Sequence, residues 1–253
     1  KMLVVVSPAK KLNMKPINKL TETQPVFSNN VNELVNIARD LTVDDIQKLM
    51  DISPKLAELN RERFQDFGNQ EKKAAAFAFA GDTYKGLDIE TMSSDDILWA
   101  QKHLRILSGL YGLLRPLDAI EPYRLEMGSK LQGGHGNSLY EYWNDKITTS
   151  LNQYGKEIKT QILVNCASNE YFNVIKPNVL SLKVITPVFL ERKDGKEKII
   201  SFYAKNARGA MARFIIQNRV LDEADLKKFN LNGYLFYPEK SNNDQIVFIR
   251  NVS

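Results

Sequence analysis

The sequence predicts an α/β fold of the mixed α+β type, in which helices surround one mixed sheet. Short apolar runs bounded by turn residues indicate buried strands, and amphipathic segments alternate with them early in the chain. Later in the chain the predicted strands cluster instead. The 253 residues include 43% hydrophobic side chains, enough for a buried core, and contain no Pro/Gly-rich linker. We therefore expect one domain over residues 2–253, with Lys1 left over from expression.

The first third of the chain predicts one strand followed by helices. "MLVVVSPAK" is an apolar run that ends in a Ser-Pro turn, as a buried strand does. Residues 18–28 predict a loop, and helical spacing follows over Asn30–Asp40 and Thr42–Asp51. Thr42 is expected to cap the second of these helices. A third helix is expected from Ser53 to about residue 67, with Pro at its first position.

The middle of the chain predicts a strand and three more helices. "AAFAFA" alternates like a strand and then turns at "GD". Ser94–Ser108 has an acidic first turn and an apolar stripe, which favour a helix that Gly109 would end. A short helix over residues 113–123 and an amphipathic helix over Ser138–Tyr154 are expected next.

The last third of the chain predicts mostly strands. Ile162–Ser168 indicates a buried strand, and residues 182–193 are expected to pair with 197–205 across an Asp-Gly turn. Asn206–Val220 predicts a helix. The runs "YLFYP" and "QIVFIR" predict two final strands.

The charge pattern is basic in two places. The net charge is +5, and residues 1–20 and 202–219 carry Lys or Arg but no acid. Such stretches indicate either a positive surface for phosphates or two solvated faces. One cysteine fits a reducing compartment, and neither a membrane-spanning run nor a signal peptide is recognised, so we expect a cytoplasmic protein.

The residues that could hold a metal are few. His103, His135 and Cys166 show no zinc-type spacing, so we expect no metal and no cofactor. "GDTYKGLD" and "GGHGN" match no nucleotide-binding fingerprint. Cys166 and Ser168 end a strand and could act as nucleophiles, although a lone buried cysteine usually belongs to the core.

"LSGLYGLLRPLD" is the segment that most suggests binding. Gly109 and Gly112 could join two helices in a tight hairpin whose backbone N–H groups hold a phosphate oxygen. Arg105, Arg115 and Arg124 flank it. A helix end followed by a plain turn is the alternative interpretation.

Two strand ends suggest a pocket. "SPAK" supplies Ser7 and Lys10, and "NCASNEY" supplies Asn165 and Glu170. Carboxyl ends of strands are where α/β proteins place functional groups. If these residues meet Arg124 and Glu126, the alternative function is an enzyme acting on a nucleotide or nucleic acid, with Glu126 as acid or base.

Several strings in one order resemble a known family. "SPAKKL", "FAGDTYKGLD", "HLRILSGLYGLLRPLDAIEPYRLEMG", "NCASNEYF" and "FYAKNARGAMARFII" closely resemble the YaaA family of bacterial peroxide-stress proteins over nearly the whole chain. Lys11 replaces the usual Thr, and Cys166 replaces a frequent Leu.

That resemblance implies a cytoplasmic protein that limits iron-dependent oxidative damage, with an unusual fold and a basic cleft. It also implies a helix-hairpin-helix element that binds double-stranded DNA without sequence preference, here over residues 103–118. The expected DNA-binding residues are Lys10, Arg105, Gly109, Tyr111, Gly112, Arg115, Arg124, Lys205 and Arg208. The oligomeric state stays open.

Overall fold

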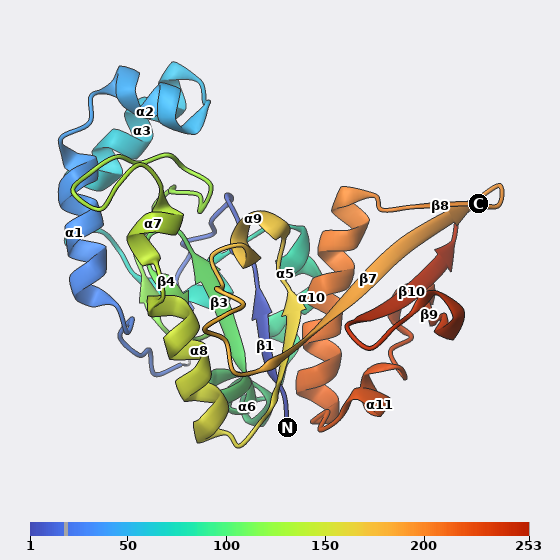
Figure 1. Cartoon of the computed structure of the whole chain (residues 1–253). Helices are drawn as coiled ribbons and strands as arrows, with labels where there is room; N and C mark the ends of the chain where they lie inside the picture. Colours follow the sequence, from blue (N-terminus) through green and yellow to red (C-terminus); the bar gives the residue numbers. More distant parts are fainter. Residues whose placement is uncertain (18–19, 253) are drawn as a thin grey trace.

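The computed structural model describes residues 1–17 and 20–252, so part of the loop expected over 18–28 lies outside the described residues. The described residues form a mixed eight-stranded sheet (Figure 1). Its main path runs β4-β3-β1-β6-β7-β10-β9, and β8 pairs with β7. The strands are β1 (Leu3–Val6), β3 (Leu104–Ser108), β4 (Gly112–Leu114), β6 (Ile162–Cys166), β7 (Lys183–Lys193), β8 (Lys196–Lys198), β9 (Leu235–Phe236) and β10 (Gln245–Asn251).

The centre of the sheet is parallel. β1 pairs in parallel with both β3 and β6, β6 continues in parallel to β7, and β7 to β10. β4 and β9 are antiparallel edge strands. The strands that follow β1 in the chain lie on both sides of it, with β3 on one side and β6 on the other. The strand order therefore reverses at β1. Crevices at the carboxyl ends of such strands are the usual ligand sites of α/β sheets.

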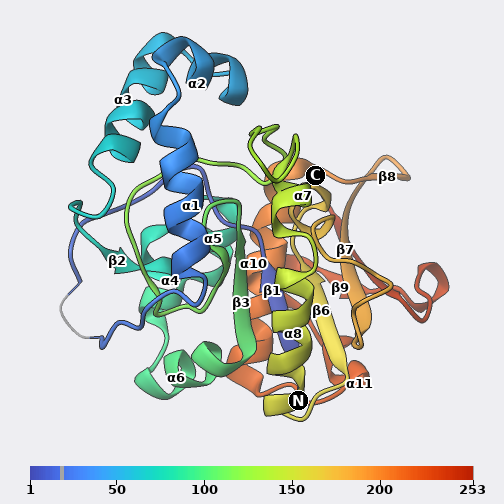
Figure 2. The same ribbon diagram turned by 60° about the vertical axis from the view of Figure 1, so that its left-hand side comes forward.

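Helices cover both faces of the sheet. α10 packs on β1, β6 and β7 together with α5, and Figure 2 shows α8 in front of the sheet with α10 behind it. α1, α2 and α3 form an arm beside β4 (Figure 1). The helices are α1 (Ser28–Arg39), α2 (Val43–Met50), α3 (Pro54–Gln65), α4 (Ala75–Ala78), α5 (Asp82–Leu87), α6 (Ser94–His103), α7 (Leu139–Trp143), α8 (Lys146–Glu157), α9 (Asn169–Phe172), α10 (Ser201–Asn218) and α11 (Glu223–Leu226). None of these helices is long and apolar enough to cross a membrane.

The mixed α/β class is confirmed, and so are most strands and the first three helices. β1, β6, β7 and β10 lie where their apolar runs predicted them. Thr42 caps α2 as expected, because its side chain accepts from the N–H of Asp45 while that carboxylate accepts from the N–H of Thr42.

The helix expected over residues 94–108 is wrong in its second half. α6 ends at His103, and the next five residues form β3, which is buried throughout and pairs with β1 through residues 104–106. The helix expected over 113–123 is also wrong, since β4 and the short strand β5 (Ala119–Ile120) occupy that segment. The predicted helix-hairpin-helix is therefore wrong. Residues 103–118 instead contain a β-hairpin whose turn holds Gly109, Leu110 and Tyr111.

Three smaller predictions also need correction. "AAFAFA" is not a strand, because α4 occupies residues 75–78 beside the short strand β2 (Lys73–Ala74), and α5 replaces the loop expected after it. The helix over 138–154 is two helices, broken at Asn144 with φ +45°. The strand expected over 197–205 ends at β8, so that α10 begins at Ser201 rather than at Asn206.

Candidate functional site

A cleft of about 450 Å³ opens at the carboxyl ends of β1 and β6. Loops after these two strands form one side, and α5, α10 and the segment 123–126 complete it. Of the residues predicted for DNA or pocket roles, the structure brings seven together in this cleft: Ser7, Lys10, Arg124, Glu126, Glu170, Lys205 and Arg208. Parallel pairing explains the convergence, because it places the ends of β1 and β6 side by side.

Hydrogen bonds join the two strand ends. The N–H of Ser168 donates to Oγ of Ser7 at 2.9 Å, and the two hydroxyl oxygens lie 3.3 Å apart. The hydroxyl of Tyr84 on α5 donates to the carbonyl of Ser7 at 2.8 Å. Burial raises the pKa of Tyr84 well above its ordinary value, so this phenol stays a donor. The loop after β1 is thereby held from two sides.

Carboxylates occupy part of the cleft wall. Oε1 of Glu126 lies 3.5 Å from Nζ of Lys10 and 3.3 Å from Nη2 of Arg124. Glu170 accepts from the N–H of Gly128 at 3.2 Å. The Nε of Arg124 is buried and has no hydrogen-bond partner among the described residues. Its guanidinium is therefore held in the cleft wall by one hydrogen bond to Glu126, and the unpaired Nε lies below the surface.

Two cations from α10 complete the cleft. Lys205 is exposed, Arg208 is half-buried, and neither makes an ion pair or hydrogen bond within residues 1–17 and 20–252. Burial lowers the pKa of Arg208, but a guanidinium remains charged at neutral pH. A half-buried charge without a partner costs free energy, and an anionic ligand would recover it.

Cys166 lies on the floor of the cleft and is 1% exposed. Burial raises its pKa to about 12, with the nearby Arg208 acting weakly in the opposite direction. The group is therefore a neutral thiol at pH 7, and reactions of cysteine need the thiolate. These properties support Cys166 as a residue of the buried core and argue against its role as a nucleophile.

Other predicted residues lie outside the cleft. Asn165 is 8% exposed, and its Oδ1 accepts from the N–H of Ala167, a local turn contact. Arg105 is 3% exposed and stacks over the ring of Tyr154 at 3.8 Å. Burial lowers its pKa to about 10, and Nη1 donates to two backbone carbonyls. Arg105 is thus held in the interior of the protein, where its Nε has no partner among the described residues, and it cannot reach a large ligand.

The glycine segment has packing roles. A Cβ on Gly109 would lie 2.2 Å from the carbonyl oxygen of Leu125, and Trp143 donates from Nε1 to the carbonyl of Gly109. Gly112 has φ +73°, and a Cβ there would lie 2.7 Å from the Trp143 ring. These glycines allow the hairpin turn to pack tightly against its neighbours.

Two other predicted DNA contacts, Tyr111 and Arg115, are also engaged within the fold. Tyr111 is 4% exposed, and its hydroxyl accepts from the N–H of Glu121. Arg115 binds the buried carboxylate of Asp118 at 2.8 Å and the carbonyl of Gln24. Neither residue lines the cleft.

Several cleft residues were not predicted from the sequence. Lys11, Asp82, Tyr123 and Tyr171 all line it. Asp82 begins α5, and the "GD" turn after an apolar run was the signal that could have pointed to it. Tyr123 follows from no local pattern, because its position depends on the long-range packing of residues 119–126.

Metal ligands do not gather in this cleft or elsewhere in the described part of the chain. No three His, Cys, Asp or Glu side chains lie together in a way that could hold a metal ion there. His103 is buried beside the carbonyl of Met2, and His135 contacts the carbonyl of Leu131.

The fold and the cleft define an α/β protein with a cation-rich cleft at the carboxyl edge of a mixed sheet. A family profile described as peroxide stress protein YaaA matches residues 2–240. The chain belongs to this family of peroxide stress proteins, and the resemblance stated from the motifs is confirmed.

Curated relatives carry the family name UPF0246. The chain is 52% identical to such a protein of Ruegeria pomeroyi over 253 residues, which cover 98% of each chain. It is 50% identical to one of Idiomarina loihiensis and 49% identical to one of Aliivibrio fischeri, again with 98% of each chain covered.

Proposed function

We propose that this peroxide stress protein binds double-stranded DNA through its phosphates at the cleft between the ends of β1 and β6. The observation that carries the proposal is the pair Lys205 and Arg208, whose side chains have no partner among the described residues and line the same cleft as Arg124. Phosphate oxygens supply the hydrogen-bond acceptors that these donors lack. A planar guanidinium can donate two parallel hydrogen bonds to one phosphate. No base-reading element is invoked, so binding is expected to be independent of sequence.

The proposal extends to the stress role. DNA covered by the protein is expected to suffer less iron-dependent cleavage by peroxide, and this shielding would limit oxidative damage. A protein that binds the chromosome is expected in the cytoplasm. Strand breaks in a plasmid exposed to ferrous iron and peroxide measure this protection. An Arg208→Gln variant that protects as well as the parent would contradict the link to the cleft.

Duplex affinity measured against salt concentration tests the binding itself. Each phosphate contact contributes about 0.9 to the slope of log K against log salt, so Arg208→Gln and Lys205→Gln should each reduce the slope by about 1. Arg115→Gln is the matched control, because Arg115 is committed to Asp118 and lies outside the cleft. An unchanged slope in both cleft variants would refute the proposal.

A second candidate is an enzyme acting on a nucleotide or nucleic acid. The observation that favours it is Glu126, a carboxylate positioned by Lys10 and Arg124 in the same cleft as Arg208. A general base must lie within hydrogen-bond reach of the proton that it takes, and Glu126 lies beside cations that could hold a phosphate of the substrate. Incubation of duplex DNA and nucleotides with the protein, followed by product analysis, would reveal turnover. Glu126→Gln should abolish it while retaining binding, and the absence of any product would exclude this candidate.

A further inference from the structure

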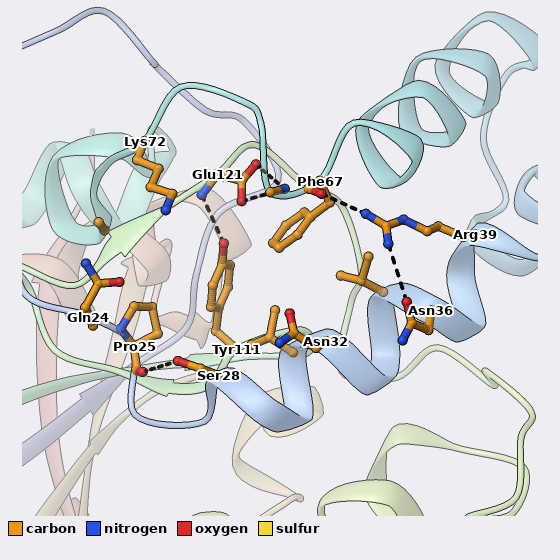
Figure 3. Close-up of a pocket in the computed structure, with 14 residues that line it drawn as sticks. Gln24, Pro25, Ser28, Asn32, Asn36, Arg39, Phe67, Lys72, Tyr111 and Glu121 are labelled. Atoms are coloured by element: carbon orange, nitrogen blue, oxygen red, sulfur yellow. Dashed lines mark hydrogen bonds between the residues drawn. The ribbon is translucent and has the colours of Figure 1, made fainter.

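A second cavity lies apart from the cleft, between α1 and the loop that follows α3. It has a volume of about 440 Å³ and shares no lining residue with the cleft. Figure 3 shows α1 along one side, with Phe67, Tyr111 and Glu121 facing it from the other. Its volume falls in the range of small-molecule sites, and its lining combines polar side chains with an aromatic ring.

The lining of this cavity is mixed, and its polar groups present somewhat more surface than its apolar ones. Val31 and Val35 are buried on α1, and Phe67 and Tyr111 stand opposite with their ring centroids 6.3 Å apart. That spacing leaves no room for a ring between the two aromatics. Because Val31, Val35 and Tyr111 are buried, a flat ligand would instead pack on the ring face of the half-buried Phe67.

Two free carboxamides are part of this lining. The side chains of Gln24 and Asn32 line the cavity, and neither makes a hydrogen bond to another residue of the described chain. Each carboxamide offers a donor and an acceptor side by side. This pattern matches the edge of a heterocyclic base, and Asn or Gln pairs with adenine in this way.

The charges of the cavity favour an anion at one end. Lys72 is exposed, its ammonium points toward the cavity near Gln24, and it forms no ion pair within the described residues. Arg39 is largely committed, because it donates to the carbonyls of Phe64 and Phe67. The buried carboxylate of Glu121 is likewise satisfied by the N–H groups of Gly68 and Gln70. Lys72 is thus the available charge.

From this arrangement we propose that the second cavity binds a mononucleotide, with its base against Phe67 and its phosphate on Lys72. The Phe67 ring takes the face of the base, the carboxamides take its edge, and the ammonium takes the phosphate. This assignment is independent of DNA binding at the cleft.

Calorimetric titration of the full chain with adenosine 5′-monophosphate tests the proposal. We expect one molecule bound per chain, with affinity at least tenfold weaker in Lys72→Gln and in Asn32→Leu. Both replaced side chains are exposed, so both variants should fold. Arg208→Gln is the control for the cleft and should change the affinity less than twofold.

Three results would overturn the assignment. The first is no heat of binding at millimolar nucleotide. The second is binding that Arg208→Gln abolishes while Lys72→Gln and Asn32→Leu retain it, which would place the nucleotide in the cleft. The third is inorganic phosphate competing as well as the nucleotide, which would show that the ring contributes nothing.

Discussion

The N–H of Ser168 donates to Oγ of Ser7 across 2.9 Å, and this contact joins the loops that follow β1 and β6. Those loops carry Lys10 and Glu170 into the cleft. This hydrogen bond therefore holds together two segments of the cleft that are 161 residues apart in the sequence, and it fixes the distance between them.

Ser7→Ala removes that acceptor and leaves the N–H of Ser168 without it. A lost hydrogen bond in a partly buried position costs about 1 kcal/mol of unfolding free energy. Urea denaturation of the variant measures this loss. Ser201→Ala, at an exposed position, should stay within about 0.5 kcal/mol of the parent. Equal stability of the two variants would show that the Ser7 contact contributes nothing.

Gly112→Ala and Gly195→Ala form a matched pair. Both glycines have a left-handed backbone, with φ +73° and +72°, but only Gly112 has a neighbour in the way, namely Trp143. Conformational strain alone should cost Gly195→Ala about 1 kcal/mol. Gly112→Ala should lose about 3 kcal/mol, because the new methyl also displaces the indole. Similar urea midpoints for both variants would argue against close packing at Gly112.

Cys166 should resist peroxide in the folded protein. Because burial raises the pKa of this thiol to about 12, almost no thiolate exists at pH 7. Mass spectrometry after peroxide treatment should show an unmodified thiol in native protein and oxidation in urea-unfolded protein. The raised pKa also stabilises the fold below pH 9, and this contribution is lost as pH rises toward 12. Rapid oxidation of the native thiol would contradict the assignment.

His103 should make stability fall in mild acid. Burial lowers its pKa to about 4 from 6.5, and its ring stacks on Trp99 with centroids 3.6 Å apart. A depressed pKa gives stability that is complete above pH 6.5 and is lost as pH falls through 4, on the order of 2 kcal/mol. The unfolding free energy of the parent should therefore decline more steeply than that of His103→Gln between pH 7 and pH 4. Parallel pH profiles would exclude His103 as the cause.

Sequence patterns predicted correctly those helices and strands for which the local preference of the segment and its packing in the fold favour the same secondary structure. Apolar runs such as residues 3–6 and 162–166 are strands in the structure, and the capped helix at Thr42 begins where expected. "LRILS" failed because a short apolar run suits a helix or a strand equally, and pairing with β1 decided between them. "AAFAFA" failed because its alternation resembles a strand, while alanine favours the helical turn α4.

The candidate site was predictable to the extent that it depends on strand ends. Ser7, Lys10 and Glu170 follow strands that parallel pairing brings together, so topology made their convergence predictable. Arg105 and Arg115 looked like surface cations, but one is buried and the other holds Asp118. Charge in a sequence does not reveal which guanidinium already has a partner, and that distinction decides which arginines remain for a ligand.

The close approach of Gly109 to Leu125 has a consequence for how mutations will act. Leu125 stands between Arg124 and Glu126 in the chain, and a side chain at position 109 would press on its carbonyl. A substitution in the turn would shift the neighbouring backbone and, with it, two charges of the cleft. Residues that do not touch a ligand can therefore change binding by moving the backbone that carries the cleft charges. A loss of binding on mutating the turn would then reflect a change in the shape of the cleft and would not identify a ligand contact.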